Sequence, residues 1–157
     1  MAMVQILHSF SIKKLEMKIA IVNGPNLNLT GHREVDVYGT QSFESFVAEL
    51  DQTYPKLEII YLQSNVEGEL INFLHQLNEQ PDIEGILLNA GAYTHTSIAL
   101  GDAVAGIGKP VIEIHLSNVF KREDFRQISY LAPSCVGSIS GFGMKSYKLG
   151  LEYFMNR

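Results

Sequence analysis

The chain has little cysteine, little positive charge and no long apolar run, and each shortage excludes a class of protein. A single cysteine, Cys135, rules out an internal disulfide and a cysteine-based metal cage, and a reducing cytoplasm fits that count. Twelve Lys and Arg against 17 Asp and Glu give a net charge of −5, which disfavours a nucleic-acid binder. No apolar stretch approaches the ~20 residues that cross a bilayer. We therefore expect a cytoplasmic protein that binds neither nucleic acid nor membrane.

The length and composition indicate one globular domain. The chain has 157 residues, of which 46% are hydrophobic and 18% charged, the usual balance of a folded domain with a substantial core. In residues 1–16, Lys13 and Lys14 follow a short apolar patch, which is the reverse of the order in a secretory signal. We interpret residues 1–16 as an N-terminal extension and residues 17–157 as a single α/β domain.

Strand and helix patterns alternate along the domain. Strands are expected over residues 18–23, 58–63, 85–89, 110–115 and 135–140, and helices over 42–53, 68–80, about 96–106 and about 143–155. The first, third and fourth strands are nearly continuous apolar runs, which are typical of parallel strands covered on both faces. The alternation predicts a flavodoxin-like three-layer fold whose five-stranded parallel sheet has the order 2-1-3-4-5.

Polar residues follow these strands at the sheet edge where ligands of parallel α/β folds bind. Nearly twenty residues separate the first strand from the next helix, where a βα loop usually has ~2–6. This loop contains Asn26, Arg33 and Tyr38, and its Asn-Gly-Pro-Asn start also fits a simple turn. Capping of the next helix explains the hydroxyl residues after the third strand, but it does not explain Asn89 or His95.

Glu113 and His115 lie two residues apart in the fourth strand, so their side chains point to one face. A buried glutamate costs several kcal/mol unless it is paired, and His115 is the natural partner. Alone, the pair fits a structural hydrogen bond as well as a catalytic one. Lys121, Arg122 and Arg126 follow in one loop; a solvated face is the alternative for this charge run, and we accept it for Lys121.

Four ordered blocks between Met17 and Arg157 resemble the type II 3-dehydroquinate dehydratases. The blocks run from Asn23 to Leu29 with Tyr38 and Gly39, from Gln63 to Glu69, from Asn89 to Ser97, and from Glu113 to Asn118 with Arg122 to Arg126. Together they span most of the domain. The resemblance implies removal of water from 3-dehydroquinate to give 3-dehydroshikimate, a step of the shikimate pathway to chorismate and aromatic amino acids, through an enolate and without imine, cofactor or metal.

The resemblance also implies the catalytic roles. Tyr38 would be the base that takes the proton next to the ketone, with Arg33 beside it. Asn26 would stabilise the enolate through a bound water. His115, oriented by Glu113, would protonate the departing hydroxyl.

The resemblance assigns further residues to substrate binding and assembly. They are Asn89, His95 and Arg126 for the ring hydroxyls, the backbone of Leu116 and Ser117 for the carboxylate, Arg122 in the same cationic set, and Asp102 reaching into a neighbouring subunit's site. The expected assembly is a homododecamer of four trimers. Gly101, beside Asp102, departs from the larger residue of many members, which bears on the local subunit contact.

This chemistry is physically reasonable. A tyrosine has a pKa near 10, so at pH 7 ionisation is short by about 4 kcal/mol. A neighbouring cation lowers the pKa of an acid by ~1–3, and Arg33 suits this role because arginine does not lose its own proton. Hydroxide is a poor leaving group, and a His115 imidazolium kept charged by Glu113 supplies the proton that it needs.

Three alternatives are weaker. A lyase that acts through a lysine imine needs a lysine at the carboxyl end of a strand, and the sequence places none there. A non-catalytic flavodoxin-like module for a nucleotide or flavin has support from Gly141, Gly143 and Lys145, but they miss the phosphate-loop spacing. A metal site at His95, Glu113 and His115 lacks a recognised ligand spacing.

Overall fold

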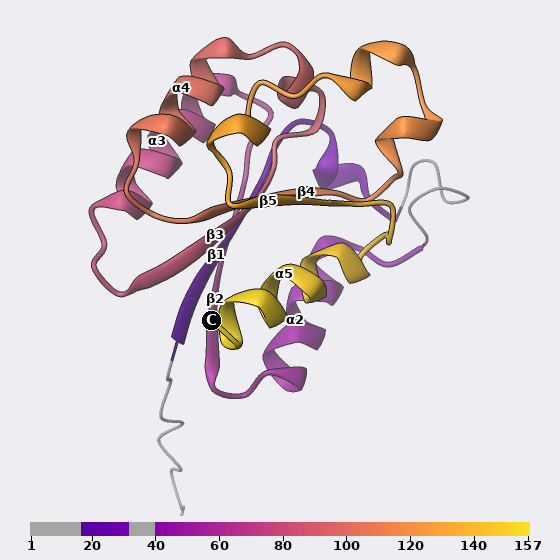
Figure 1. Cartoon of the computed structure of the whole chain (residues 1–157). Helices are drawn as coiled ribbons and strands as arrows, with labels where there is room; N and C mark the ends of the chain where they lie inside the picture. Colours follow the sequence, from indigo (N-terminus) through magenta and orange to yellow (C-terminus); the bar gives the residue numbers. More distant parts are fainter. Residues whose placement is uncertain (1–16, 32–39) are drawn as a thin grey trace, which may run out of the picture.

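The computed structural model describes residues 17–31 and 40–157, and Figure 1 shows their arrangement. Five parallel strands form one sheet in the order β2-β1-β3-β4-β5, which confirms the predicted order. Their bounds are Met17–Asn23 for β1, Leu57–Gln63 for β2, Ile83–Asn89 for β3, Val111–His115 for β4 and Gly137–Ser140 for β5. The predicted extension over residues 1–16 lies outside the described residues.

The apolar strands supply a hydrophobic core on each face of the sheet. Alternate residues of a strand point to opposite faces. In β1, Ile19 and Ile21 therefore pack into one core while Ala20 and Val22 pack into the other, and all four are fully buried. Burial on both faces explains why β1, β3 and β4 are nearly continuous apolar runs.

Two pairs of helices cover the two faces (Figure 1). α2 (Phe43–Thr53) and α5 (Lys145–Met155) lie on one face, and α3 (Glu67–Asn78) and α4 (Ile98–Gly106) lie on the other. α2 and α4 begin after serine caps: Ser42 Oγ accepts from Ser45 N at 3.2 Å, and Ser97 Oγ accepts from Leu100 N at 2.8 Å. Among the described residues, no helix is long and apolar enough to span a membrane.

The fifth strand begins later than predicted. Cys135 was expected to open it, but the residue follows a short 3-10 turn (Ala132–Ser134), and its N–H donates to the Ala132 carbonyl at 3.1 Å. An N–H that closes a turn is unavailable to the sheet ladder. β5 therefore starts at Gly137, after Val136 N has bonded the Val111 carbonyl at 2.7 Å.

Two glycines allow backbones to approach closely where the loops of the carboxyl edge meet. A Cβ on Gly24 would lie 2.5 Å from the Ala90 carbonyl oxygen, so the loops after β1 and β3 are in direct contact. A Cβ on Gly101 would lie 2.6 Å from the carbonyl oxygen of Tyr130. The small residue at position 101 is thus explained within this chain, by the close approach of the β4–β5 connection to α4.

Candidate active site

A cleft of about 170 Å³ opens at the carboxyl ends of β1, β3 and β4. From β1 the chain passes to β2 on one side and then to β3 on the other, so the strand order reverses here. Gly24 N donates to the Asn89 carbonyl at 2.7 Å across this point. The predicted site residues that line the cleft are Asn26, Asn89, His95, His115, Leu116, Ser117, Arg122 and Arg126.

His115 lines the cleft and Glu113 lies behind it, both of them buried. Nε2 of His115 donates to Oε1 of Glu113 at 2.7 Å, which is the predicted pairing. Oε2 of Glu113 accepts a hydrogen bond from Ser129 Oγ at 2.5 Å. Both carboxylate oxygens are thus hydrogen-bonded, as a buried charge requires. With Nε2 engaged, Nδ1 is the ring nitrogen of His115 that remains for a ligand.

His95 lies over His115, with ring centroids 5.9 Å apart and planes 19° from parallel. Nδ1 of His95 lies 2.6 Å from the Ile128 carbonyl oxygen, which only accepts, so Nδ1 carries the hydrogen and Nε2 keeps a lone pair. Burial lowers the pKa of His95 below its ordinary 6.5, against the Ile128 bond that raises it. The neutral ring therefore offers an acceptor to the cleft.

Asn26 is held from the edge strand β2. Its backbone is left-handed, with φ of 66°, and its N–H donates to Asn65 Oδ1 at 2.9 Å. Asn65 Oδ1 also accepts from Gln63 Nε2 at 3.1 Å, and the same nitrogen donates to the Gly24 carbonyl at 3.2 Å. The block from Gln63 to Glu69 thus contributes by fixing the loop that carries Asn26.

Asn89 is oriented from beneath by a tyrosine of α5. Its Nδ2 donates to the Tyr147 hydroxyl at 2.9 Å, and its Oδ1 accepts from Gly91 N at 3.2 Å. The Tyr147 hydroxyl in turn donates to Asn23 Oδ1 at 2.7 Å. Complete burial holds the pKa of Tyr147 above its ordinary 10.0, so this hydroxyl stays neutral. The network leaves one amide hydrogen of Asn89 for a ligand.

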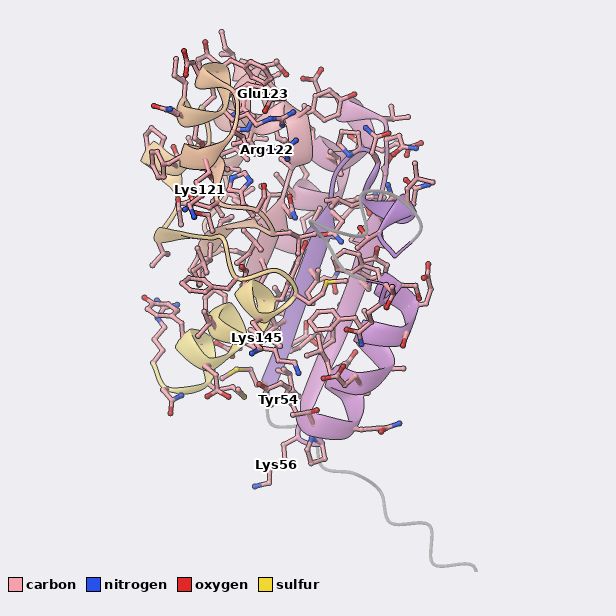
Figure 2. All side chains as sticks on the ribbon, turned by 90° about the vertical axis from the view of Figure 1, so that its right-hand side faces the viewer. Tyr54, Lys56, Lys121, Arg122, Glu123 and Lys145 are labelled. Carbon is pink, nitrogen blue, oxygen red and sulfur yellow. The ribbon has the colours of Figure 1, made fainter. Side chains whose placement is uncertain are left out.

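Two arginines form a cationic side of the cleft around one glutamate, and Figure 2 shows Arg122 next to Glu123. Nε of Arg126 lies 2.7 Å from Glu123 Oε2, and Nε of Arg122 lies 3.5 Å from the same oxygen. The hydrogen bond from Arg126 lowers the pKa of Glu123 to about 2. Arg122 also donates to Ser117 Oγ at 3.4 Å. Glu123 therefore stays ionised and holds the two guanidinium groups together.

The glycine-rich segment before α5 supports the end of β4. Gly141 N donates to the His115 carbonyl at 3.3 Å, and Gly143 N donates to the Leu116 carbonyl at 2.9 Å. Ser146 Oγ also donates to the His115 carbonyl, at 3.0 Å. A phosphate loop needs free backbone N–H groups. Here two of them are bonded to protein carbonyls, which disfavours the nucleotide-binding alternative.

The remaining predicted residues are Arg33, Tyr38 and Asp102. Arg33 and Tyr38 lie outside the described residues. Asp102 is exposed on α4 and does not line the cleft of its own chain. Sequence reasoning assigned no role to Asn65, Ser129 or Tyr147. Of these, only Asn65 had a signal, because it follows the end of a strand as the predicted residues do. Nothing in the sequence joins Ser129 or Tyr147 to the site.

Comparisons with known proteins show the family of this chain. The sequence matches the family described as dehydroquinase class II over residues 17–155. It is 53% identical over 137 residues to the 3-dehydroquinate dehydratase of Carboxydothermus hydrogenoformans, covering 86% of this chain and 88% of that relative. It is 51% identical over 146 residues to that of an Exiguobacterium species, covering 90% and 99%.

A solved structure is also similar. The type II dehydroquinase from Butyrivibrio crossotus has a TM-score of 0.84 at 39% identity and covers 89% of this chain and 98% of its own. The fold and the comparisons place the chain among the α/β hydro-lyases. It belongs to the class II dehydroquinase family.

Proposed function

We propose that this protein removes water from 3-dehydroquinate in the cytoplasm by an anti elimination through an enolate, with a tyrosinate as base and a histidine as general acid. The observation that carries the proposal is the buried pair at the end of β4: His115 faces the cleft, and Glu113 accepts from its far nitrogen at 2.7 Å. Amide, imidazole and guanidinium groups surround this acid, which suits a substrate rich in hydroxyls and bearing a carboxylate.

Tyr38 is the proposed base, and Arg33 is the proposed cation that lowers its pKa. The two residues belong to the segment between Gly31 and Thr40. These flanking residues lie together, since a Cβ on Gly31 would be 2.9 Å from the Thr40 carbonyl oxygen, and Thr30 lines the cleft. The described residues on either side of this segment thus lie together next to Thr30 of the cleft, which supports a base carried between them.

In the first step the Tyr38 phenolate takes the proton from the carbon next to the ketone, and the electron pair of that bond forms the enolate. Asn26 stabilises the enolate through a bound water. In the second step the enolate re-forms the ketone and expels the hydroxyl, which leaves as water with a proton from Nδ1 of His115. Exchange with solvent restores the tyrosinate and the imidazolium.

Substrate binding follows from the hydrogen-bonding roles in the cleft. Nε2 of His95 accepts from a ring hydroxyl, because Nδ1 already donates to the Ile128 carbonyl. The remaining amide hydrogen of Asn89 and the guanidinium of Arg126 donate to ring oxygens. The backbone N–H groups of Leu116 and Ser117 hold the carboxylate, next to the positive charge of Arg122.

The test is an assay with 3-dehydroquinate that follows the ultraviolet absorbance of the conjugated enone product. Tyr38→Phe should abolish turnover and leave substrate binding near normal, measured by calorimetry. Retained turnover in this variant would reject the base assignment. Borohydride added with substrate should trap no covalent adduct, whereas a trapped adduct would indicate an imine and reject the mechanism.

A homododecamer built from four trimers is part of the proposal. Apolar side chains of the β4–β5 connection, close to the cleft, are 44% to 69% exposed: Phe120, Phe125, Ile128 and Tyr130. Several large apolar side chains exposed on one connection are typical of subunit contacts. Asp102, exposed on α4, would then serve a neighbouring subunit's cleft. Sedimentation should give the dodecamer mass, and a monomer would contradict the assembly.

A further inference from the structure

Ser129 does not line the cleft, yet it contacts the carboxylate that orients His115. It lies on the connection between β4 and β5, three residues before the last 3-10 turn begins at Ala132. Its hydroxyl oxygen is 2.5 Å from Glu113 Oε2, on the carboxyl oxygen that His115 does not use. The serine thus contacts the buried pair at the carboxyl oxygen that His115 leaves free.

The backbone determines the direction of this hydrogen bond. A serine hydroxyl has one hydrogen and two lone pairs. Leu131 N donates to Ser129 Oγ at 3.1 Å, and Ala132 N donates to it at 2.9 Å, so both lone pairs are used. The single hydrogen is left for Glu113 Oε2. Ser129 is therefore a fixed donor, and Oε2 of Glu113 is a fixed acceptor.

The segment that carries Ser129 is itself tied to the cleft wall. The next residue, Tyr130, donates its N–H to the Thr94 carbonyl at 3.0 Å. The Tyr130 carbonyl oxygen packs closely against Gly101 of α4. Thr94 lies in the 3-10 turn (Gly91–His95) that carries His95. On the other side of Ser129, the Ile128 carbonyl is bonded to His95. Hydrogen bonds therefore hold the chain both before and after the serine.

We propose that Ser129 is a positioning residue for catalysis: its hydroxyl locks the Glu113 carboxylate so that Nδ1 of His115 is presented to the leaving hydroxyl. The proposal rests on the proposed role of His115 as general acid. Without the bond to Ser129, the carboxylate can rotate about its last torsion and Oε2 is left buried without a donor. The cost appears in the chemical step, because Ser129 does not line the cleft that binds substrate.

The test compares three substitutions at Ser129. Ser129→Ala should lower kcat about ten- to hundredfold, the factor that corresponds to a hydrogen bond to a charged group. KM should stay within about twofold, because no substrate contact is lost. Ser129→Thr retains the hydroxyl and should keep most of the turnover. Ser129→Cys has a similar size and a weak S–H donor, so its kcat should fall between the two.

Ser134→Ala is the matched control, because Ser134 lies on the same connection and its exposed hydroxyl makes no hydrogen bond among the described residues. It should keep full turnover. The free energy of unfolding is measured for every variant, because Ser129 also caps Leu131 N and Ala132 N. A loss of stability with unchanged kcat in Ser129→Ala would show that the serine only caps the backbone, and would overturn the inference.

A double-mutant cycle with Glu113→Gln separates positioning from a general structural effect. If Ser129 acts through Glu113, Ser129→Ala should lower kcat much less in the Glu113→Gln background than in the native enzyme. Equal losses in both backgrounds would overturn the inference. If His115→Asn leaves turnover unchanged, the proposed general acid fails instead. A large loss in His115→Asn with none in Ser129→Ala would reject the role of Ser129 alone.

Discussion

The two ends of the same sheet hold charge in opposite ways. At the amino end, Lys18 Nζ lies 3.1 Å from Glu58 Oε1 and 2.8 Å from Asp82 Oδ2, and the carboxylates are exposed to solvent. At the carboxyl end, Glu113 and His115 are buried. Figure 2 shows the two ends of the molecule, with Arg122 and Glu123 at the carboxyl end of the sheet and Tyr54 and Lys56 at the amino end.

This difference shows that the fold buries its paired polar groups at the carboxyl end of the sheet. Exposed ion pairs gain little because water already solvates each partner well. A buried pair is expensive unless every polar atom finds a partner. At the carboxyl end, both carboxylate oxygens of Glu113 accept hydrogen bonds, and the Asn89 amide is held through its Nδ2 and its Oδ1. We expect substitutions at this end to affect turnover or stability strongly, and substitutions at the amino end to affect neither much.

The largest effect is expected at His115. His115→Asn removes the proposed proton donor, so kcat should fall by roughly 10²–10⁴, the usual contribution of a general acid. His75→Asn is the matched control, since His75 is exposed on α3 and does not line the cleft. The enone assay measures both. A His115→Asn enzyme with native kcat would contradict the claim that the buried pair at the carboxyl end of the sheet acts in turnover.

The next effect is on stability, at the network beneath the cleft. Tyr147→Phe deletes the hydroxyl that joins Asn23 to Asn89 and leaves buried polar atoms without partners, which should lower the free energy of unfolding by about 1–3 kcal/mol. Tyr153→Phe on the same helix, with an exposed ring, should change it by less than about 0.5 kcal/mol. Urea unfolding compares the two, and equal changes would contradict a special role for the buried hydroxyl.

A third test concerns the contact between α4 and the β4–β5 connection. Gly101→Ala places a methyl group 2.6 Å from the Tyr130 carbonyl oxygen, so the connection has to shift, at a cost of about 1–3 kcal/mol. Gly106→Ala meets no atom within 4 Å and should stabilise by about 0.4–1 kcal/mol. Thermal unfolding should move in opposite directions for the two variants. A Gly101→Ala protein as stable as the native one would show that this contact is not tight.

The smallest effect is expected at the amino end, in Lys18→Met, and it should depend on pH. The hydrogen bond from Lys18 lowers the pKa of Asp82 below 3.8, so this stabilisation is present above that value and is lost as pH falls. The bonds from Asp82 and Glu58 raise the pKa of Lys18 above 10.5, so its contribution is present below that value and is lost as pH rises.

Native and Lys18→Met proteins should therefore differ in urea midpoint only between these limits, and less at high salt. Turnover should not change. A difference that grows as the pH falls below about 4 would contradict the assigned pKa shift of Asp82. A large loss of turnover in Lys18→Met would contradict the expectation that only the carboxyl end of the sheet acts in turnover.

Local sequence patterns predicted the architecture and most residues of the candidate site. Continuous apolar runs and helical spacings predicted all five strands and the four long helices, because burial on two faces leaves a pattern within each local segment. The rule for strand ends pointed to the segments that hold most of the residues assigned by the family resemblance, since parallel strands all end at one edge. Asn26, His95 and His115 line one cleft for that reason.

The contacts that hold these residues in place come from the packing of distant segments. Asn65 contacts Asn26 across 39 positions of sequence, and Tyr147 contacts Asn89 across 58. The bond from Ser129 to Glu113 spans 16 positions and depends on a loop path that no local pattern encodes. Such contacts arise when separate segments pack together, so neither spacing nor composition reveals them. The sequence indicates which polar side chains belong to the candidate site. The packing of the chain determines whether each of them donates or accepts a hydrogen bond, and in which direction.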